Sequence, residues 1–180
     1  TLKGVRRKKD EVVSRSMITL DCDTLDPSFF EEYEADHKYE SIVYTTHTHL
    51  PEAPRARLLI PFTRDVTPEE YNAVIRYLAA GIGMEKVDPC SFLVNQMMYW
   101  PTCSSDGEYI CKRYDGDPLD PDAFLSAYPD WKNPTTLPLH LSEKEQQNRQ
   151  QKKQEDPLTK DGIVGTFCRA YGMEDAIRTF

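Results

Sequence analysis

Long hydrophobic runs are missing from this sequence of 180 residues. A membrane-spanning helix needs about 18 or more consecutive apolar residues, and no run of that length occurs. The basic residues 1–9 are not followed by an apolar stretch, so the sequence does not predict a secretory signal peptide either. These absences predict a cytoplasmic protein with no membrane partner.

Paired cysteines are missing as well. The five cysteines are odd in number and include no Cys-x-x-Cys pair, which argues against both a disulfide framework and a structural zinc site. No internal repeat is visible.

Basic residues are fewer than acidic ones: the chain has 22 Lys and Arg but 30 Asp and Glu, which gives a formal net charge of -8. Such a balance usually disfavours nucleic-acid binding, but the charges are unevenly spread. Basic residues gather in 1–15 and again at Arg55, Arg57 and Arg64, whereas acidic residues concentrate in 21–40 and 115–130. The basic N-terminal segment either contacts phosphates or is a solvated charge run, and both interpretations stay open.

Apolar residues make up 39% of the chain, which is enough to form a core for one substantial domain and a small appendage. We expect a main domain over 1–133, a polar linker over 134–156 and a small helical element over 157–180. The chain begins with Thr and stops inside an amphipathic pattern, so we expect it to be a fragment of a longer protein.

The main domain shows both strand and helix patterns. Residues 17–22 predict a short buried strand, after which Pro27 begins a helix with acidic first turns. The β-rich runs 39–46 and 57–62 predict a hairpin with a long, proline-stiffened connection. Residues 67–70 form a Thr-Pro-Glu-Glu capping box before apolar residues at helical spacing, and that helix should end near Gly81 or Gly83. This mixture predicts an α+β fold with a mixed or antiparallel sheet and flanking helices.

The second half is less regular. Residues 96–100 and 109–114 look like strands on either side of a Ser-Ser-Asp-Gly turn. The polar tract 142–156 has no apolar face, so it is a linker or a solvent-exposed helix. Residues 161–180 regain apolar periodicity and predict two short helices broken at Gly172.

The most informative short motif is Asp21-Cys22-Asp23 at the end of the first strand. Side chains alternate along a strand, so both carboxylates lie on one side of the backbone and repel each other unless a cation is present. Hard oxygen ligands suit Mg²⁺ or Mn²⁺, which take one or two protein carboxylates and complete their shell with water and substrate phosphates. The alternative is a helix cap with surface charge.

Three further groups of residues could join this site. His47 and His49 lie at the mouth of the hairpin, where a histidine can donate to a phosphate oxygen, or they are exposed turn residues. Asp88 precedes Pro89, which favours an extended conformation from which the carboxylate could complete a metal triad. Its alternative is an ordinary turn residue.

Arg55 and Arg57 alternate on the second hairpin strand and could clamp a triphosphate, or they protect an edge strand with charge. The run 97–100, Met-Met-Tyr-Trp, is interpreted as core rather than as a base-stacking platform.

Taken in order, the Asp-x-Asp, the Thr-x-His of the hairpin and the later Asp resemble the three motifs of the archaeo-eukaryotic primase superfamily. Further segments resemble the phage and mobile-element primases that precede a virulence-associated helicase domain, and together they cover most of residues 15–180. These segments are 44–61, 66–71, the Met-Tyr-Trp-Pro at 98–101, and 156–171.

The resemblance implies DNA-templated primer synthesis by two-metal nucleotidyl transfer on an RRM-like core. It implies that Asp21, Asp23 and Asp88 bind Mg²⁺ or Mn²⁺, while His47 or His49 holds nucleotide phosphates together with Arg55 and Arg57. The expected partners are single-stranded DNA template, nucleoside triphosphates and a helicase domain in the same or a partner chain. Two alternatives remain: a His-x-His replication-initiator nuclease, and a catalytically inactive domain that positions DNA for the helicase.

Overall fold

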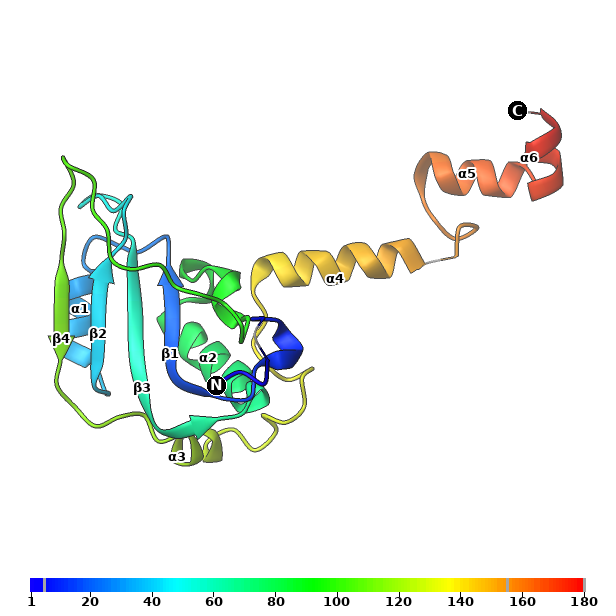
Figure 1. Cartoon of the computed structure of the whole chain (residues 1–180). Helices are drawn as coiled ribbons and strands as arrows, with labels where there is room; N and C mark the ends of the chain where they lie inside the picture. Colours follow the sequence, from blue (N-terminus) through cyan, green and yellow to red (C-terminus); the bar gives the residue numbers. More distant parts are fainter. Residues whose placement is uncertain (5, 155, 180) are drawn as a thin grey trace. The chain divides into compact units, whose positions relative to one another are not determined.

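The computed structural model describes residues 1–4, 6–154 and 156–179 (Figure 1). The described residues form four strands, β1 (Arg15–Cys22), β2 (Ser41–Thr45), β3 (Ala56–Val66) and β4 (Cys111–Tyr114). They also form the helices α1 (Phe29–Asp36), α2 (Pro68–Ile82), α3 (Pro121–Ser126), α4 (Leu141–Gln154), α5 (Gly162–Ala170) and α6 (Met173–Thr179). Short 3-10 helices are η1 (Lys9–Glu11), η2 (Met84–Lys86) and η3 (Pro89–Phe92). Within these residues, no helix has both the length and the apolar character that crossing a bilayer requires.

The strands build one antiparallel sheet in the order β1-β3-β2-β4, which confirms the predicted α+β class. The hairpin strand β3 lies between β1 and β2, so the crossover through α1 joins two strands that are not neighbours. Strand β4 adds to the outer edge of β2. Of the two sheet types expected, mixed or antiparallel, the structure has the antiparallel one.

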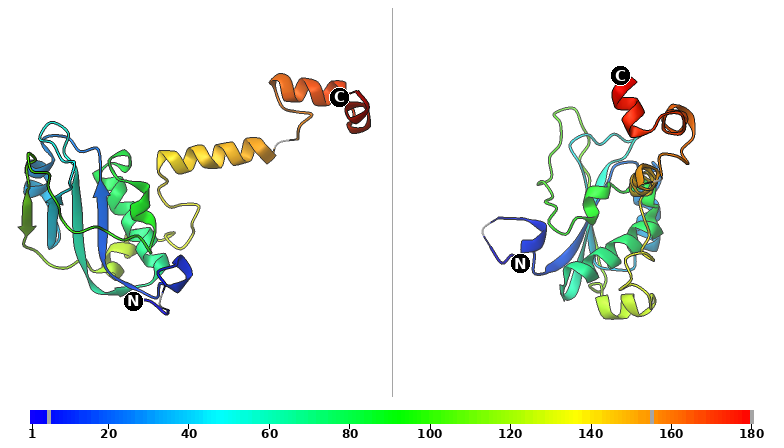
Figure 2. Two further views of the ribbon diagram at one scale, coloured as in Figure 1. Left: turned by 45° about the horizontal axis from the view of Figure 1, so that its top comes forward. Right: turned by 90° about the vertical axis from the view of Figure 1, so that its right-hand side faces the viewer.

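The two faces of the sheet differ because side chains alternate along each strand. On one face, Ile18, Leu20, Val43, Leu58 and Ile60 are all at most 3% exposed. Helices α1 and α2 lie against this face, whereas the loop between η3 and β4 runs over the other one (Figure 2). We call these the helix face and the open face. The core therefore lies between the sheet and the two helices.

Helix α2 follows the sequence prediction closely. Thr67 accepts a hydrogen bond from the Glu70 amide, the Glu70 carboxylate accepts one from the Thr67 amide, and Pro68 is the first helical residue. The helix ends at Ile82, and the next residue, Gly83, has a φ of 116°, a conformation that glycine adopts without the strain of a Cβ atom.

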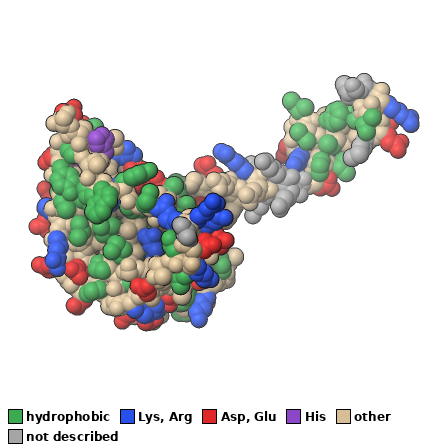
Figure 3. Space-filling view, viewed as in Figure 1, with side chains coloured by type: hydrophobic (Ala, Val, Ile, Leu, Met, Phe, Trp, Pro, Cys, Tyr) green, Lys and Arg blue, Asp and Glu red, His purple; other side chains and the backbone are tan. Residues whose placement is uncertain are grey.

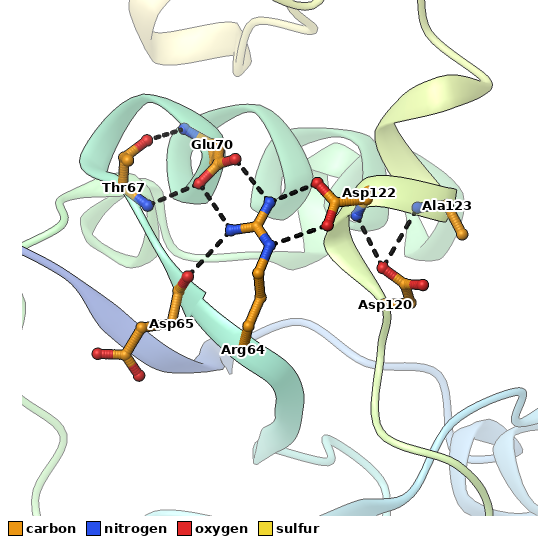
Figure 4. A network of polar contacts seen from close by, with 7 residues as sticks. All are labelled: Arg64, Asp65, Thr67, Glu70, Asp120, Asp122 and Ala123. Atoms are coloured by element: carbon orange, nitrogen blue, oxygen red, sulfur yellow. Dashed lines mark hydrogen bonds and ion pairs between the residues drawn. The ribbon is translucent and has the colours of Figure 1, made fainter.

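An arginine near the end of β3 joins two helix N-termini (Figure 4). The Arg64 guanidinium binds Glu70 of α2 at 2.8 Å and Asp122 of α3 at 2.5 Å. Asp120 caps α3 by accepting hydrogen bonds from the amides of Asp122 and Ala123. This network fixes both helices to the strand, at the end of β3 remote from Arg57.

Three predictions for the second half need correction. Residues 96–100 form no strand, since Pro101 cannot donate to a ladder and restricts the preceding residue. The strand expected over 109–114 is shorter, at Cys111–Tyr114. The core assignment for 97–100 is wrong, because Tyr99 is 72% exposed and Trp100 is 88% exposed. Of the two readings of the polar tract, the structure has the helix, α4.

The chain divides into two compact units, Thr1–His140 and Leu141–Phe180. In the second unit, α5 and α6 are separated near Gly172, as predicted. Arg169 donates to the carbonyl oxygens of Leu158 and Lys160 and so holds the turn before α5. Residue 155 of the expected linker and residue 180 of the expected C-terminal element lie outside the described residues.

Candidate functional site

Asp21 and Asp23 lie at the carboxyl end of β1, with Cys22 between them turned into the core. The backbone around them is fixed from a distant part of the chain. The Asp21 amide donates to the Ser91 hydroxyl at 2.9 Å, and the Asp23 amide donates to the Lys86 carbonyl at 3.0 Å. The alternation that the sequence predicts is therefore present, and both acids leave the backbone on the open side.

Each acid is paired with an arginine of the hairpin. Arg57 stands opposite Asp21 in the β1–β3 register, and its Nη2 lies 3.1 Å from the Asp21 Oδ2. Arg55 Nη2 lies 2.9 Å from the Asp23 Oδ1. The inner pair is the more enclosed, with side-chain exposures of 14% and 20% against 37% for both members of the outer pair. The antiparallel register thus gathers two negative and two positive groups at one end of the sheet.

The positive charge near the Asp21 carboxyl does not fully compensate for its burial. Burial raises the pKa of the Asp21 carboxyl, and the hydrogen bond and charge of Arg57 offset this only partly. The charges of Asp23 and Asp88 raise the pKa further. The Asp21 Oδ1 atom is buried and has no hydrogen-bond partner among the described residues. A buried carboxylate oxygen in this state is destabilising unless another donor or a cation reaches it.

A cavity of about 350 Å³ opens beside the four charged groups. Its wall on the far side is the loop over the open face, where the Tyr99 carbonyl accepts hydrogen bonds from the Tyr44 hydroxyl and from Arg57 Nη1, each at 3.2 Å. The cavity is lined by Asp21, Asp23, Thr46, His47, Thr48, Arg55, Arg57, Tyr99 and Thr102. Charged and hydroxyl groups dominate this lining, as expected for a polar, phosphate-bearing ligand.

The two hairpin histidines differ in their surroundings. His47 is exposed and lines the cavity. His49 is 4% exposed, packs edge-on against Phe30 and accepts a hydrogen bond at Nδ1 from the Arg55 amide at 3.2 Å. Burial lowers the pKa of His49, so its neutral form is favoured, and the acceptor role of Nδ1 places the proton on Nε2. His49 therefore stabilises the hairpin loop, while His47 lines the cavity.

Asp88 lies next to β1 but does not line the cavity. Its amide donates to the Asp21 carbonyl at 2.8 Å, and its carboxylate accepts a hydrogen bond from the Cys90 amide at 2.7 Å as the N-cap of η3. Among the described residues, no group of three or more His, Cys, Asp or Glu side chains is arranged to hold a metal ion. The structure thus brings together Asp21, Asp23, His47, Arg55 and Arg57, and leaves His49 and Asp88 outside the cavity.

The donor set still fits a magnesium or manganese ion of the two-carboxylate type. Mg²⁺ is commonly bound by one or two protein carboxylates, with water and substrate phosphates completing its shell. The Oδ1 atom of Asp21, to which no side chain or amide of the described part of the chain donates a hydrogen bond, is available as a ligand atom. Asp21 and Asp23 are accordingly the residues that could hold such an ion.

The sequence does not single out Tyr44 or Ser91 near the site, and it predicts the wrong surroundings for Tyr99. Tyr44 follows from the β2–β3 register, since it stands opposite Arg57 on the open face. Ser91 carries no local signal, because its contact with Asp21 spans 70 residues of sequence. The sequence predicts a core position for Tyr99, but the path of its loop places this residue at the cavity.

Comparison with known protein families finds a match for most of the chain. The family model of the VapE N-terminal domain matches residues 1–140. No curated protein matches the chain, and no solved structure does. The matched range coincides with the first compact unit, Thr1–His140, which contains the whole candidate site.

Proposed function

The chain belongs to the VapE N-terminal domain family, and from this premise we propose that it is a primase-polymerase that makes primers on a single-stranded DNA template. Membership of this family is consistent with a domain that precedes a VapE-type helicase. In the proposal, the domain supplies primers for the replication of a phage or mobile element, and the helicase is in the same or a partner chain.

The observation that carries the proposal is the buried, unpartnered Oδ1 of Asp21 beside Asp23 and two arginines. Nucleotidyl transfer needs a carboxylate centre for a divalent ion and, next to it, positive groups for a triphosphate. In the proposal, Asp21 and Asp23 at the end of β1 are the carboxylate centre, and Arg55 and Arg57 at the beginning of β3 are the positive groups. Their register brings both to one cavity.

In this proposal Asp21 and Asp23 hold Mg²⁺ or Mn²⁺. When bound, the ion would lower the pKa of the attacking 3′-hydroxyl and neutralise charge on the leaving pyrophosphate. Arg55 and Arg57 donate to the phosphates through their planar guanidinium groups, and His47 adds a further donor from the hairpin loop. The arginines already compensate the two acids in the structure, so they are placed to exchange a carboxylate oxygen for a phosphate oxygen as substrate binds.

Asp88 has weaker support as a third metal ligand. Its carboxylate is engaged with the Cys90 amide, and it would have to give up this cap to reach the cavity. A supporting role fits its contacts better, since its amide holds the Asp21 carbonyl. Its negative charge also contributes to the raised pKa of Asp21.

The two alternatives find less support in the geometry. A His-x-His nuclease needs both imidazoles at one metal ion, but His49 is buried with its Nδ1 bound to the Arg55 amide. A domain that only positions DNA would need the positive charge of Arg55 and Arg57 for phosphates, but it would not need the two carboxylates that these arginines face.

The test is primer synthesis by the full chain on single-stranded DNA with labelled nucleotides and Mg²⁺ or Mn²⁺. We expect Asp21→Asn and Asp23→Asn each to lower synthesis about 100-fold or more, because the ion is no longer held. Asp26→Asn is the matched control, since Asp26 is an acid of the same segment that pairs with Lys86 outside the cavity. Unchanged synthesis in both site variants would refute the proposal. A parent that makes no primer but forms a 5′-covalent DNA adduct would favour the nuclease.

A further inference from the structure

The loop between η3 and β4 is tied to the site by its backbone rather than by its side chains. The Tyr99 carbonyl accepts one hydrogen bond from the Tyr44 hydroxyl and another from Arg57 Nη1, both at 3.2 Å. Arg57 also binds Asp21 through Nη2. One guanidinium therefore connects the carboxylate centre to the loop, and it fixes where residue 99 lies relative to the acids.

The aromatic ring at this anchored position is left free. Tyr99 is 72% exposed although it lines the cavity. A tyrosine ring can bury 150–250 Å² of apolar surface, by the usual range for aromatic side chains, so leaving it exposed forgoes a large stabilisation. Figure 3 views the open face and shows apolar side chains gathered over the strands, in keeping with the exposure of Met17, Ile42 and Tyr99. The ring thus contributes little to folding and is available to a ligand.

We propose that Tyr99 binds the base of the nucleotide by stacking, in the same cavity where Arg55 and Arg57 hold its phosphates. This inference rests on the proposed function and deepens it. The hairpin side of the cavity carries the two arginines, and the loop side carries Tyr99 and Thr102, so a ligand whose phosphates lie at the arginines can bring a flat base to the exposed Tyr99 ring. Its volume of about 350 Å³ lies within the usual range for small-molecule sites.

Binding by stacking limits how well the site can distinguish one base from another. Every base has a π face, so a tyrosine ring accepts all of them and favours the larger purines only slightly. The Tyr99 carbonyl, and not its phenol, carries the hydrogen bonds to Tyr44 and Arg57. Phenylalanine at position 99 should therefore keep both the carbonyl hydrogen bonds and an aromatic ring on which a base can stack. Selection of the base would then come from pairing with the template.

The neighbouring Trp100 provides a matched control. It is 88% exposed but is not among the residues that line the cavity. Pro101 restricts Trp100 to an extended backbone, in which successive side chains point to opposite sides. Trp100 has the larger ring, so a general effect of removing an exposed aromatic residue would be greater there than at Tyr99.

The experiment measures binding of ATP and of inorganic tripolyphosphate to the full chain by calorimetry, with Mn²⁺ present. Tripolyphosphate has the phosphates but no base. We expect Tyr99→Ala to weaken ATP binding about 10- to 100-fold while leaving tripolyphosphate binding unchanged, in line with the usual effect of removing a stacked ring. Tyr99→Phe and Trp100→Ala should both bind ATP as the parent does.

Each other outcome overturns the inference in a distinct way. Tyr99→Ala binding ATP as tightly as the parent, or losing ATP and tripolyphosphate equally, would contradict stacking. Loss of binding to a single-stranded oligonucleotide, with ATP binding intact, would assign Tyr99 to the template strand instead. A parent that binds ATP and tripolyphosphate equally overturns this inference alone, whereas a parent that binds neither overturns the proposed function as well. An unchanged melting temperature for Tyr99→Ala would show that the fold is intact.

Discussion

The helix face and the open face of the sheet are formed by the same strands but have different roles. Along β3, Leu58 is 1% exposed under the helices, whereas its neighbours Arg57 and Leu59 lie on the open face. On β1, Leu20 faces the core and Asp21 faces the cavity. Because strand side chains alternate, residues that stabilise the core and residues of the candidate site are neighbours in the sequence but lie on opposite faces of the sheet. Substitutions on the two faces should therefore have different consequences.

The largest effect on stability is expected on the helix face. Leu58→Ala should lower the free energy of unfolding by about 2–5 kcal/mol, because a buried leucine loses its contacts and leaves a cavity. Leu59→Ala, one residue along on the open face, should cost less than half as much. Urea unfolding followed by circular dichroism measures both. Equal losses in the two variants would mean that the open face is also packed.

A second contrast is between the two ends of β3. Arg57 serves the cavity, whereas Arg64 joins α2 and α3 through Glu70 and Asp122. Arg64→Met should lower the free energy of unfolding by about 1 kcal/mol, since the side chain is 38% exposed and its ion pairs are partly screened.

Arg113→Met is the control for Arg64, because Arg113 is also ion-paired but is 66% exposed. It should cost less. Adding 1 M NaCl should shrink the Arg64 effect, because salt screens partly exposed charges. A cost for Arg113→Met as large as that for Arg64→Met would argue against the special role of the Arg64 network.

The two histidines contrast within one loop. Burial holds the pKa of His49 below its ordinary value, so the unfolded chain takes up the proton first as the pH falls. The contribution of His49 to stability is therefore fully present above about pH 6.5, the ordinary pKa, and is lost as the pH falls toward the folded pKa. Thermal unfolding between pH 7.5 and 5.5 should show this loss in the parent and in His47→Asn, but less of it in His49→Asn. Identical pH profiles for all three would contradict the stabilising role that we assign to His49.

The smallest effect on stability is expected at Asp21, and its dependence on pH has the opposite sign to that of His49. Its pKa is raised, so the folded chain holds this proton more tightly than the unfolded chain, and ionisation removes stability as the pH rises through the carboxyl range. Asp21→Asn should leave stability unchanged or slightly higher at pH 8, with no gain at pH 4. Melting temperatures at the two pH values measure this difference. A clear loss of stability at pH 8 would show that the Arg57 pair outweighs the burial of Asp21.

Much of the fold was readable from local patterns. The capping box of α2, the alternation of β1 and the proline-stiffened hairpin are encoded within a few residues each, and the structure contains all three. The strand predicted over 96–100 does not form, because β-rich composition cannot show whether a partner strand is in reach. Pro101 and the path over the open face decide against a strand there.

For the candidate site, the sequence by itself determined the residue types and their alternation: two acids at a strand end, two arginines on one side of the facing strand. Only the tertiary structure decided which of the other residues join them. His49 and His47 are two residues apart and share a motif, yet Phe30 and the Arg55 amide bury the first and leave the second at the cavity. The contacts of Asp21 with Ser91 and Asp88, and the anchoring of Tyr99 by Arg57, span from 42 to 70 residues. Local patterns cannot specify such contacts, because they form only when distant segments pack together.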